Sequence, residues 1–485
     1  MALNSLKLII LFLMLCFVLG IIQLFVNKFN KSIFSKMQML CILIFSYGFM
    51  AYANIRFALC IFIVTVFTYL CALQIQKKNQ LYSKKKLTIS ISLLILMLGY
   101  FKYTNFFLSG ITKVLGLDSV TLKIILPLGI SFYIFTAIGY LIDIYRRDYE
   151  AETSFLNFAL FIGIFTKVTA GPIVRGNVFL PQAKEYKGIH WNQFTTGMQI
   201  FVMGLFKKMV IADHLGVFVN DVYNAPGIFS TGTVILAVIS YALQIYFDFS
   251  GYSDMAVGMS KALGFDLSKN FNYPYMAENP SEFWSRWHIS LSSWFRDYLY
   301  IPLGGSRKGK TRTYINLMLV MLLSGLWHGA GMTFILWGAL HGIASCIHKL
   351  FKDTRKKQRK GEPARENVFI KTIKIVAMAI TAALFWVPFR AESLANTMEI
   401  YKAMFTIHDG IVQPYTWSFF AIICLVIATI AASYKCKKKA IKKIDGTYPV
   451  VDLTTVAGLT VFFVVIGLTI MMGYYGNTAF IYGNF

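Results

Sequence analysis

Charged residues are scarce in this sequence, and their scarcity excludes a soluble globular protein. Asp, Glu, Lys and Arg make up only 14% of the 485 residues, whereas 57% are hydrophobic and 16% are aromatic. An average soluble domain contains about 25% charged residues. The composition therefore predicts a polytopic membrane protein that is embedded in a lipid bilayer.

Acidic residues are fewer still, with 22 Asp and Glu against 47 Lys and Arg and a net charge of +25. The basic residues gather in short clusters between apolar runs, at 77–86, 349–374 and 435–443. Such clusters are typical of cytoplasmic loops under the positive-inside rule. No basic stripe interleaved with aromatic residues accompanies them, so no nucleic-acid partner is expected.

Several motifs of known chemistry are also missing. The sequence contains no GxGxxG, P-loop, GxSxG or HExxH pattern, which disfavours nucleotide hydrolysis and a serine nucleophile. Its cysteines form no CxxC motif and no Cys/His spacing suited to zinc, so we expect neither disulfides nor a metal site. The first apolar run, 6–26, has no small-residue cleavage site after it, and we expect it to be retained as a span.

Apolar runs that are long enough to cross a bilayer core of about 30 Å occur throughout the chain. We expect spans near 6–26, 37–53, 57–75, 87–108, 122–145, 197–220, 232–256, 312–328, 331–349, 370–390, 416–434 and 453–474. Alternation then places the basic loops 27–36, 76–86, 300–311, 350–369 and 435–450 in the cytoplasm and both termini outside.

This topology requires the apolar run 155–174 to return to the side from which it enters. The sequence Ala170-Gly171-Pro172 offers a break, because proline removes a helix hydrogen bond. A broken segment persists at membrane depth only when it is buried in protein or lines a cavity. We therefore expect a re-entrant element within one membrane domain, 1–485, whose core, 122–349, carries the active site between the flanking helices of 1–121 and 370–485.

An interfacial amphipathic helix is predicted from Pro280 to about Tyr300. Asn279 suits the N-cap, proline suits the first helical position, and Glu282 follows three residues after the cap. Apolar and polar residues then alternate with helical spacing between two faces. The apolar face comprises Trp284, Trp287, Leu291, Trp294, Phe295 and Tyr298, and the other face carries Arg286, Ser290, Ser293 and Asp297.

Two histidines stand in apolar surroundings where an ionisable group is costly. His288 falls on the aromatic side of the predicted helix, and His328 ends the apolar run 315–327. Such residues in membrane proteins are often functional, although a histidine bonded to one backbone carbonyl would fit the same pattern. A buried neutral imidazole can accept a proton from a hydroxyl, so His328 suits O-acyl transfer from a thioester.

His341 lies one turn after Trp337 on the next predicted helix, where it is either a packing residue or a partner of the other histidines. Four carboxylates also fall within or near spans, at Asp143, Asp213, Asp248 and Asp254. Asp248 and Asp254 are six residues apart and do not share a helix face, so we expect buried ion pairs rather than acid/base catalysis. The candidate cationic partners are Arg175, Arg286 and Arg296.

Five blocks of this sequence resemble the membrane-bound O-acyltransferase (MBOAT) family, and within it the bacterial alginate O-acetyltransferase (AlgI) type. The resemblance covers most of the chain and is sharpest over 240–345. The blocks are AGPIVR at 170–175, QIYFDFSGYSDMA at 244–256, NFNYPY at 270–275, EFWSRWHISLSSWFRDYLYIPLGGSRKG at 282–309, and GLWHGA with LWGALHG at 325–342.

The resemblance implies an all-α fold of about 11–13 tilted membrane-spanning helices around a central funnel, with interfacial and re-entrant helices. It implies that His328 is the family's essential histidine, that His288 is the upstream one, and that Arg175 lines the passage. The donor would be a cytoplasmic acyl thioester such as acetyl-CoA, with no bound cofactor. The acceptor would be a glycan, or a partner protein that carries the acetyl group onward, outside the bacterial cell membrane.

We expect the thioester to enter past the indoles of Trp284 and Trp287. His328 would deprotonate the accepting hydroxyl, while His288 orients the donor or stabilises developing charge. The indole N–H of Trp287 or Trp327 is a candidate for holding the carbonyl oxygen.

Two alternatives stay open. One is a D-alanyl transferase of the teichoic-acid type, which takes its acyl group from a carrier protein. The other is a transporter or a non-catalytic scaffold of a polysaccharide export complex. The absence of internal repeats and of paired broken helices counts against a transporter.

Overall fold

The computed structural model describes residues 3–26, 31–77, 80–118, 121–358, 367–413, 451–476 and 480–481, with isolated positions between 417 and 424. The predicted basic loop 435–450 and most of the predicted span 416–434 lie outside these residues. Every regular element within the described ranges is a helix, and the extended chain there forms one isolated bridge between Phe229 and Ile411. The prediction of an all-α protein is confirmed.

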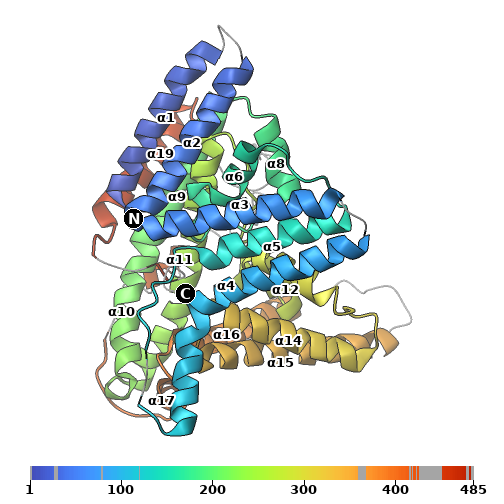
Figure 1. Ribbon diagram of the computed structural model, residues 1–485. Helices are drawn as coiled ribbons and strands as arrows, with labels where there is room; N and C mark the ends of the chain where they lie inside the picture. Colours follow the sequence, from blue (N-terminus) through green and yellow to red (C-terminus); the bar gives the residue numbers. More distant parts are fainter. Residues whose placement is uncertain are drawn as a thin grey trace.

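Five helices open the fold: α1 (Leu6–Val26), α2 (Lys31–Ala53), α3 (Ile55–Lys77), α4 (Gln80–Leu115) and α5 (Ile130–Arg146). Helices α1 and α2 pack as a pair, and α3, α4 and α5 run alongside one another (Figure 1). The predicted span 122–145 is wrong at its start, because the chain becomes helical only at Ile130. Pro127 disfavours helical backbone before it, and Gly129 enters the helix with a positive φ of 71°.

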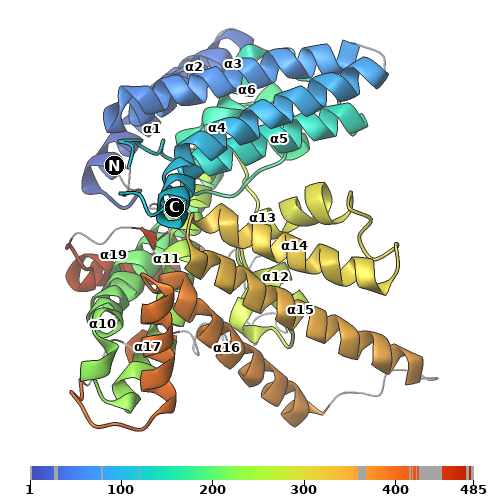
Figure 2. The ribbon, with the colours of Figure 1, turned by 60° about the horizontal axis from the view of Figure 1, so that its bottom comes forward.

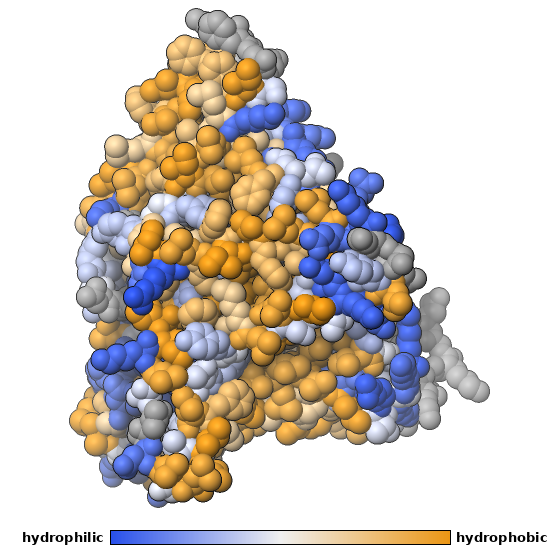
Figure 3. Space-filling model, in the orientation of Figure 1, coloured by the Kyte–Doolittle hydropathy of each residue, from blue (hydrophilic) through white to orange (hydrophobic). Residues whose placement is uncertain are grey.

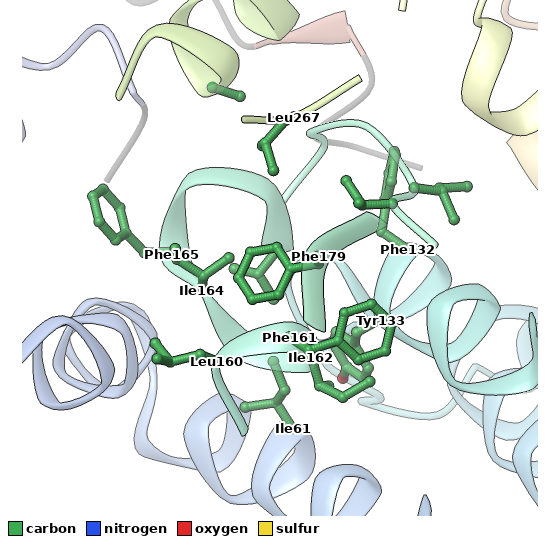
Figure 4. Packing of buried hydrophobic residues seen from close by; sticks show 14 of the residues in the cluster. Ile61, Phe132, Tyr133, Leu160, Phe161, Ile162, Ile164, Phe165, Phe179 and Leu267 are labelled. Carbon is green, nitrogen blue, oxygen red and sulfur yellow. The ribbon is translucent and has the colours of Figure 1, made fainter. Parts of the chain in front are cut away.

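The run 155–174 does not form one span. It is divided into α6 (Phe155–Gly163) and α7 (Phe165–Val168), and α8 (Gly176–Lys184) follows after an extended stretch. The side chains of both broken helices are largely buried, with Phe161 of α6 facing Phe179 of α8 (Figure 4). This break and burial are what the predicted re-entrant element requires, while the side of the membrane to which the segment returns stays a prediction.

The middle of the chain forms α9 (Trp191–Leu205), a π-helix η1 (Phe206–Ala212), α10 (Asp213–Asn224), the short turn η2 (Pro226–Ile228) and α11 (Thr231–Ala262). Helix α11 is mostly buried and contacts α9, η1, α10, α16 and α17. It therefore serves as the central helix against which the N-terminal and C-terminal halves pack.

The site lies on the elements that follow: η3 (Pro274–Met276), α12 (Pro280–Arg286), α13 (Ile289–Phe295), the π-helix η4 (Arg296–Tyr300) and α14 (Lys310–His328). The chain continues with α15 (Met332–Gln358), α16 (Val368–Arg390), α17 (Leu394–Phe405) and α19 (Val456–Met472). Figure 2 shows α14, α15 and α16 fanned out below α4 and α5, with one end of each near α11.

Seven helices in the described part are long and apolar enough to cross a membrane: α1, α2, α3, α4, α11, α15 and α16. Helices α5 and α19 cover other predicted spans but have only 17 residues each. Apolar residues dominate the face seen in Figure 3, and hydrophilic ones gather at its right-hand edge, where α3 and α5 end in Figure 1, and in smaller patches at the lower left. The chain is therefore a multi-pass membrane protein, as predicted.

Buried apolar residues form two clusters that meet at the site. The first extends from α1 through α9 to the C-terminal part of α11 and includes Trp327. The second surrounds α10, the start of α11, α16 and α17, and includes Trp287 and Trp337. His288 and His328 contact aromatic rings of both clusters, so the histidines lie where the two halves of the protein join.

Candidate active site

His288 lies at a sharp turn between two short helices, so the prediction of one continuous helix from Pro280 to Tyr300 is wrong. The N-terminal cap is as expected, because the Asn279 side chain accepts a hydrogen bond from the Glu282 N–H at 3.0 Å. Helix α12 nevertheless ends at Arg286, and His288 adopts a left-handed conformation with φ 43° and ψ 54°. A left-handed residue other than glycine is strained and persists only where its surroundings hold it.

Asn270, which the sequence did not single out, holds this turn. Its side-chain oxygen lies 3.2 Å from His288 Nδ1 and accepts hydrogen bonds from the Ser290 N–H at 3.2 Å and the Ser290 hydroxyl at 2.9 Å. Its backbone carbonyl accepts from the Ile289 N–H at 2.9 Å, and its amide donates to Ser253 at 3.3 Å. Only its place in the block NFNYPY pointed to it.

The His288 imidazole is 1% exposed, and burial lowers its pKa to about 3. Its ring centre lies 4.7 Å from that of Phe249 and 6.4 Å from that of Phe132. An apolar cage of this kind disfavours the charged form, so His288 is neutral at physiological pH.

The indole ring of Trp327 contacts both His288 and His328. Its ring centre lies 6.0 Å from that of His288 and 5.0 Å from that of His328. Phe132 and Phe135 of α5 pack on the same indole at 5.2 and 5.6 Å. Residues that are 40 positions apart therefore face one buried indole, as an active site containing both histidines requires.

A second tryptophan, Trp337 on α15, continues the cluster. Its ring centre lies 5.0 Å from that of His328 and 5.0 Å from that of His341. The ring centre of His341 in turn lies 4.9 Å from that of Trp284. Helices α14 and α15 approach closely here, because a Cβ at Gly325 would lie 2.2 Å from the Phe334 carbonyl oxygen. These ring contacts fit both predicted roles of His341, a packing residue and a partner of the other histidines, and the choice between them stays a prediction.

Three indole N–H groups in this cluster have no hydrogen-bond acceptor among the described residues, namely those of Trp284, Trp327 and Trp337. Buried donors without partners are rare in folded proteins and call for an explanation. Their gathering around the histidines favours a polar ligand that accepts hydrogen bonds at this place.

Two of the predicted substrate-binding residues have other contacts. Trp287 packs into the second cluster, with ring centres 4.7 Å from Trp386 and 5.1 Å from Phe271. Arg175 forms an ion pair with Asp297 at 3.1 Å and lies 4.1 Å from the ring centre of Tyr298. Arg175 is about one-fifth exposed, so it lies nearer the surface than the histidines do.

Three of the four predicted carboxylates pair with lysines instead of the candidate arginines. Lys208 Nζ lies 2.6 Å from both Asp213 and Asp248, and Lys207 lies 2.6 Å from Asp254. Arg286 pairs with Glu282 and Arg296 with Asp297, while Asp143 accepts hydrogen bonds from Tyr298 and Tyr149. The two lysines lie in a π-helix inside the apolar run 197–220, and the pattern of that run gives no sign of their partners.

The residues 147–389 match the family model described as MBOAT, membrane-bound O-acyltransferase family. This range contains both histidines, the turn at His288 and the helices α11 to α16. The chain belongs to the membrane-bound O-acyltransferase family. It is therefore an O-acyltransferase, and the resemblance drawn from the five sequence blocks is confirmed.

The names of curated relatives of this O-acyltransferase refer to more than one polymer. "Probable alginate O-acetylase AlgI" of Azotobacter vinelandii is 38% identical over 407 residues, which cover 82% of this chain and 79% of the relative. "Peptidoglycan O-acetyltransferase" of Helicobacter pylori is 36% identical, covering 77% and 74%. "Teichoic acid D-alanyltransferase" of Streptococcus thermophilus is 30% identical, covering 54% of this chain and 68% of the relative.

Proposed function

We propose that this O-acyltransferase moves an acetyl group from a cytoplasmic thioester, acetyl-CoA, to a hydroxyl on the other side of the bacterial cell membrane. The acceptor is a cell-surface or secreted polysaccharide, or a partner protein that passes the acetyl group to one. The names of the more similar relatives support an acetyl group and a polysaccharide acceptor. The observation that carries the proposal is that His288 and His328 face the same buried indole.

In this mechanism His328 accepts the proton of the attacking hydroxyl. The hydroxyl oxygen forms a bond to the thioester carbonyl carbon, the carbon–sulfur bond breaks, and the thiolate leaves with the proton delivered by the imidazolium. General-base catalysis of this kind contributes about 10²- to 10⁴-fold to the rate. Holding the two reactants about 3–3.5 Å apart supplies much of the remainder.

Negative charge develops on the carbonyl oxygen when the hydroxyl attacks. The N–H of Trp327 is buried beside both histidines and can donate to that oxygen. A donor held in place within a water-poor site stabilises such charge more strongly than water does. His288, which is neutral, orients the donor thioester beside the same indole.

The arrangement of basic residues supports a cytoplasmic entrance. Helix α3 ends at Lys77, α5 ends at Arg146, and α14 begins at Lys310. These ends lie on the right-hand side of the molecule in both Figures 1 and 2. Basic residues on one edge of a membrane protein mark its cytoplasmic side. Arg175 contacts the same Tyr298 ring as Arg146, so it lies beside this edge, where its ion pair with Asp297 would have to open for it to meet an anionic donor.

D-Alanyl transfer from a carrier protein is the second candidate, because a teichoic acid D-alanyltransferase also matches this chain. The same histidines and the same thioester chemistry would serve it. The two candidates differ in the acyl group and in the molecule that carries it, so a direct assay separates them.

The test uses the purified protein in proteoliposomes with labelled acetyl-CoA, compared with a D-alanyl carrier protein. We expect label release from acetyl-CoA, and we expect His328→Ala to lower turnover by at least about 10²-fold. His190→Ala is the matched control, since His190 is exposed. Unchanged turnover in His328→Ala would remove the assigned role, and release only from the D-alanyl carrier would support the second candidate.

A further inference from the structure

Lys102 lies within the predicted span 87–108, on helix α4, and contacts the end of the helix that carries His328. Its amine donates hydrogen bonds to the backbone carbonyl of Trp327 and, at 3.4 Å, to that of His328. The amine also lies 5.6 Å from the ring centre of Trp327. Next to it, the Tyr103 hydroxyl donates to the Leu326 carbonyl at 2.6 Å. Two adjacent residues of α4 thus bind three successive carbonyls of α14.

These carbonyls belong to the last turn of α14, which ends at His328. The final four carbonyls of a helix have no N–H partner within the helix, and the helix end carries a partial negative charge. A lysine amine satisfies such carbonyls and interacts favourably with that charge. Lysine within a membrane span is costly, and its presence there indicates a function.

We propose that Lys102 is a positioning residue for acyl transfer, because it holds the end of α14 so that Trp327 and His328 face His288. The inference rests on the proposed function of His328. Lys102 and Tyr103 lie outside the residues 147–389 that match the family model, so the N-terminal flanking helices contribute to the geometry of the active site. The contact is to backbone carbonyls and does not involve the imidazole of His328 or the indole N–H of Trp327.

The experiment measures kcat and KM for acetyl-CoA with Lys102→Met, Lys102→Arg and the control Lys113→Met in proteoliposomes. Lys113 is on the same helix and its side chain is exposed. Displacing reacting groups by about 1 Å costs up to about 100-fold in rate. We therefore expect Lys102→Met to lower kcat by about 10- to 100-fold with little change in KM. Lys102→Arg keeps a cationic donor and should restore most of the activity, and Lys113→Met should behave as wild type.

Wild-type kcat in Lys102→Met would overturn the inference. So would a loss of activity that Lys102→Arg does not rescue and that accompanies lower thermal stability, since Lys102 would then be only a structural residue. If Lys102→Met does not fold, Lys102→Leu replaces it, because leucine likewise has no hydrogen-bond donor for the carbonyls; wild-type kcat in that variant would also overturn the inference. His328→Ala separates the two proposals: if it stays active, the proposed function of His328 fails, whatever Lys102 does.

Discussion

The left-handed backbone of His288 leads to an unusual prediction: glycine should be a more stable substitute than alanine at this position. Both substitutions remove the imidazole and leave the same space among Phe132, Phe249 and Trp327. They differ only in the Cβ of alanine, which is strained at the φ of 43° that the turn imposes.

The magnitude follows from two opposing effects. Left-handed backbone costs a residue with a Cβ about 1–2 kcal/mol, and glycine avoids that cost. Glycine also loses more chain entropy than alanine on folding, and this loss cancels about 0.5–1 kcal/mol of that advantage. His288→Gly should therefore exceed His288→Ala in free energy of unfolding by about 0.5–1 kcal/mol. Both variants should lose acyl transfer equally, because both lack the imidazole.

The assay is unfolding in mixed detergent and SDS micelles, followed by circular dichroism. The control pair is Ser285→Gly and Ser285→Ala, three residues earlier on α12, where the side chain is exposed and the backbone is helical. There the order should reverse, with alanine more stable by about 0.5–1 kcal/mol. Alanine proving the more stable substitute at both positions would refute the argument that the turn at His288 stores strain.

Two further predictions concern buried polar groups. Asn270→Leu keeps the volume but leaves the Ser290 N–H and hydroxyl without their acceptor, so stability should fall by about 2–5 kcal/mol in the same unfolding assay. Asn272→Leu, at an exposed position, should change it little, and equal stability of the two variants would contradict the role of Asn270. Lys208→Met should cost about 3–5 kcal/mol, because two carboxylates stay buried without a counter-charge. Adding Asp213→Asn and Asp248→Asn should restore much of that loss, and no recovery would show that the ion pairs are not its cause.

The sequence determined the class of protein and pointed to the residues of its candidate site. Apolar runs of bilayer length can satisfy their backbone groups only as helices, so the all-α membrane fold follows from composition alone. The same scarcity of polar residues made His288 and His328 conspicuous, because an ionisable side chain needs a reason to be buried. Both inferences depend on composition and on neighbouring residues in the sequence, and neither requires knowledge of how the helices pack.

Tertiary structure decided the details that local pattern could not contain. Periodicity predicted an unbroken helix through His288, but contacts from Asn270, 18 residues earlier, hold a left-handed turn there. The carboxylates pair with Lys207 and Lys208, and Lys102 reaches a helix end 225 residues away. Charge pairing and helix capping between distant segments depend on how the helices pack, and sequence spacing carries no record of that packing.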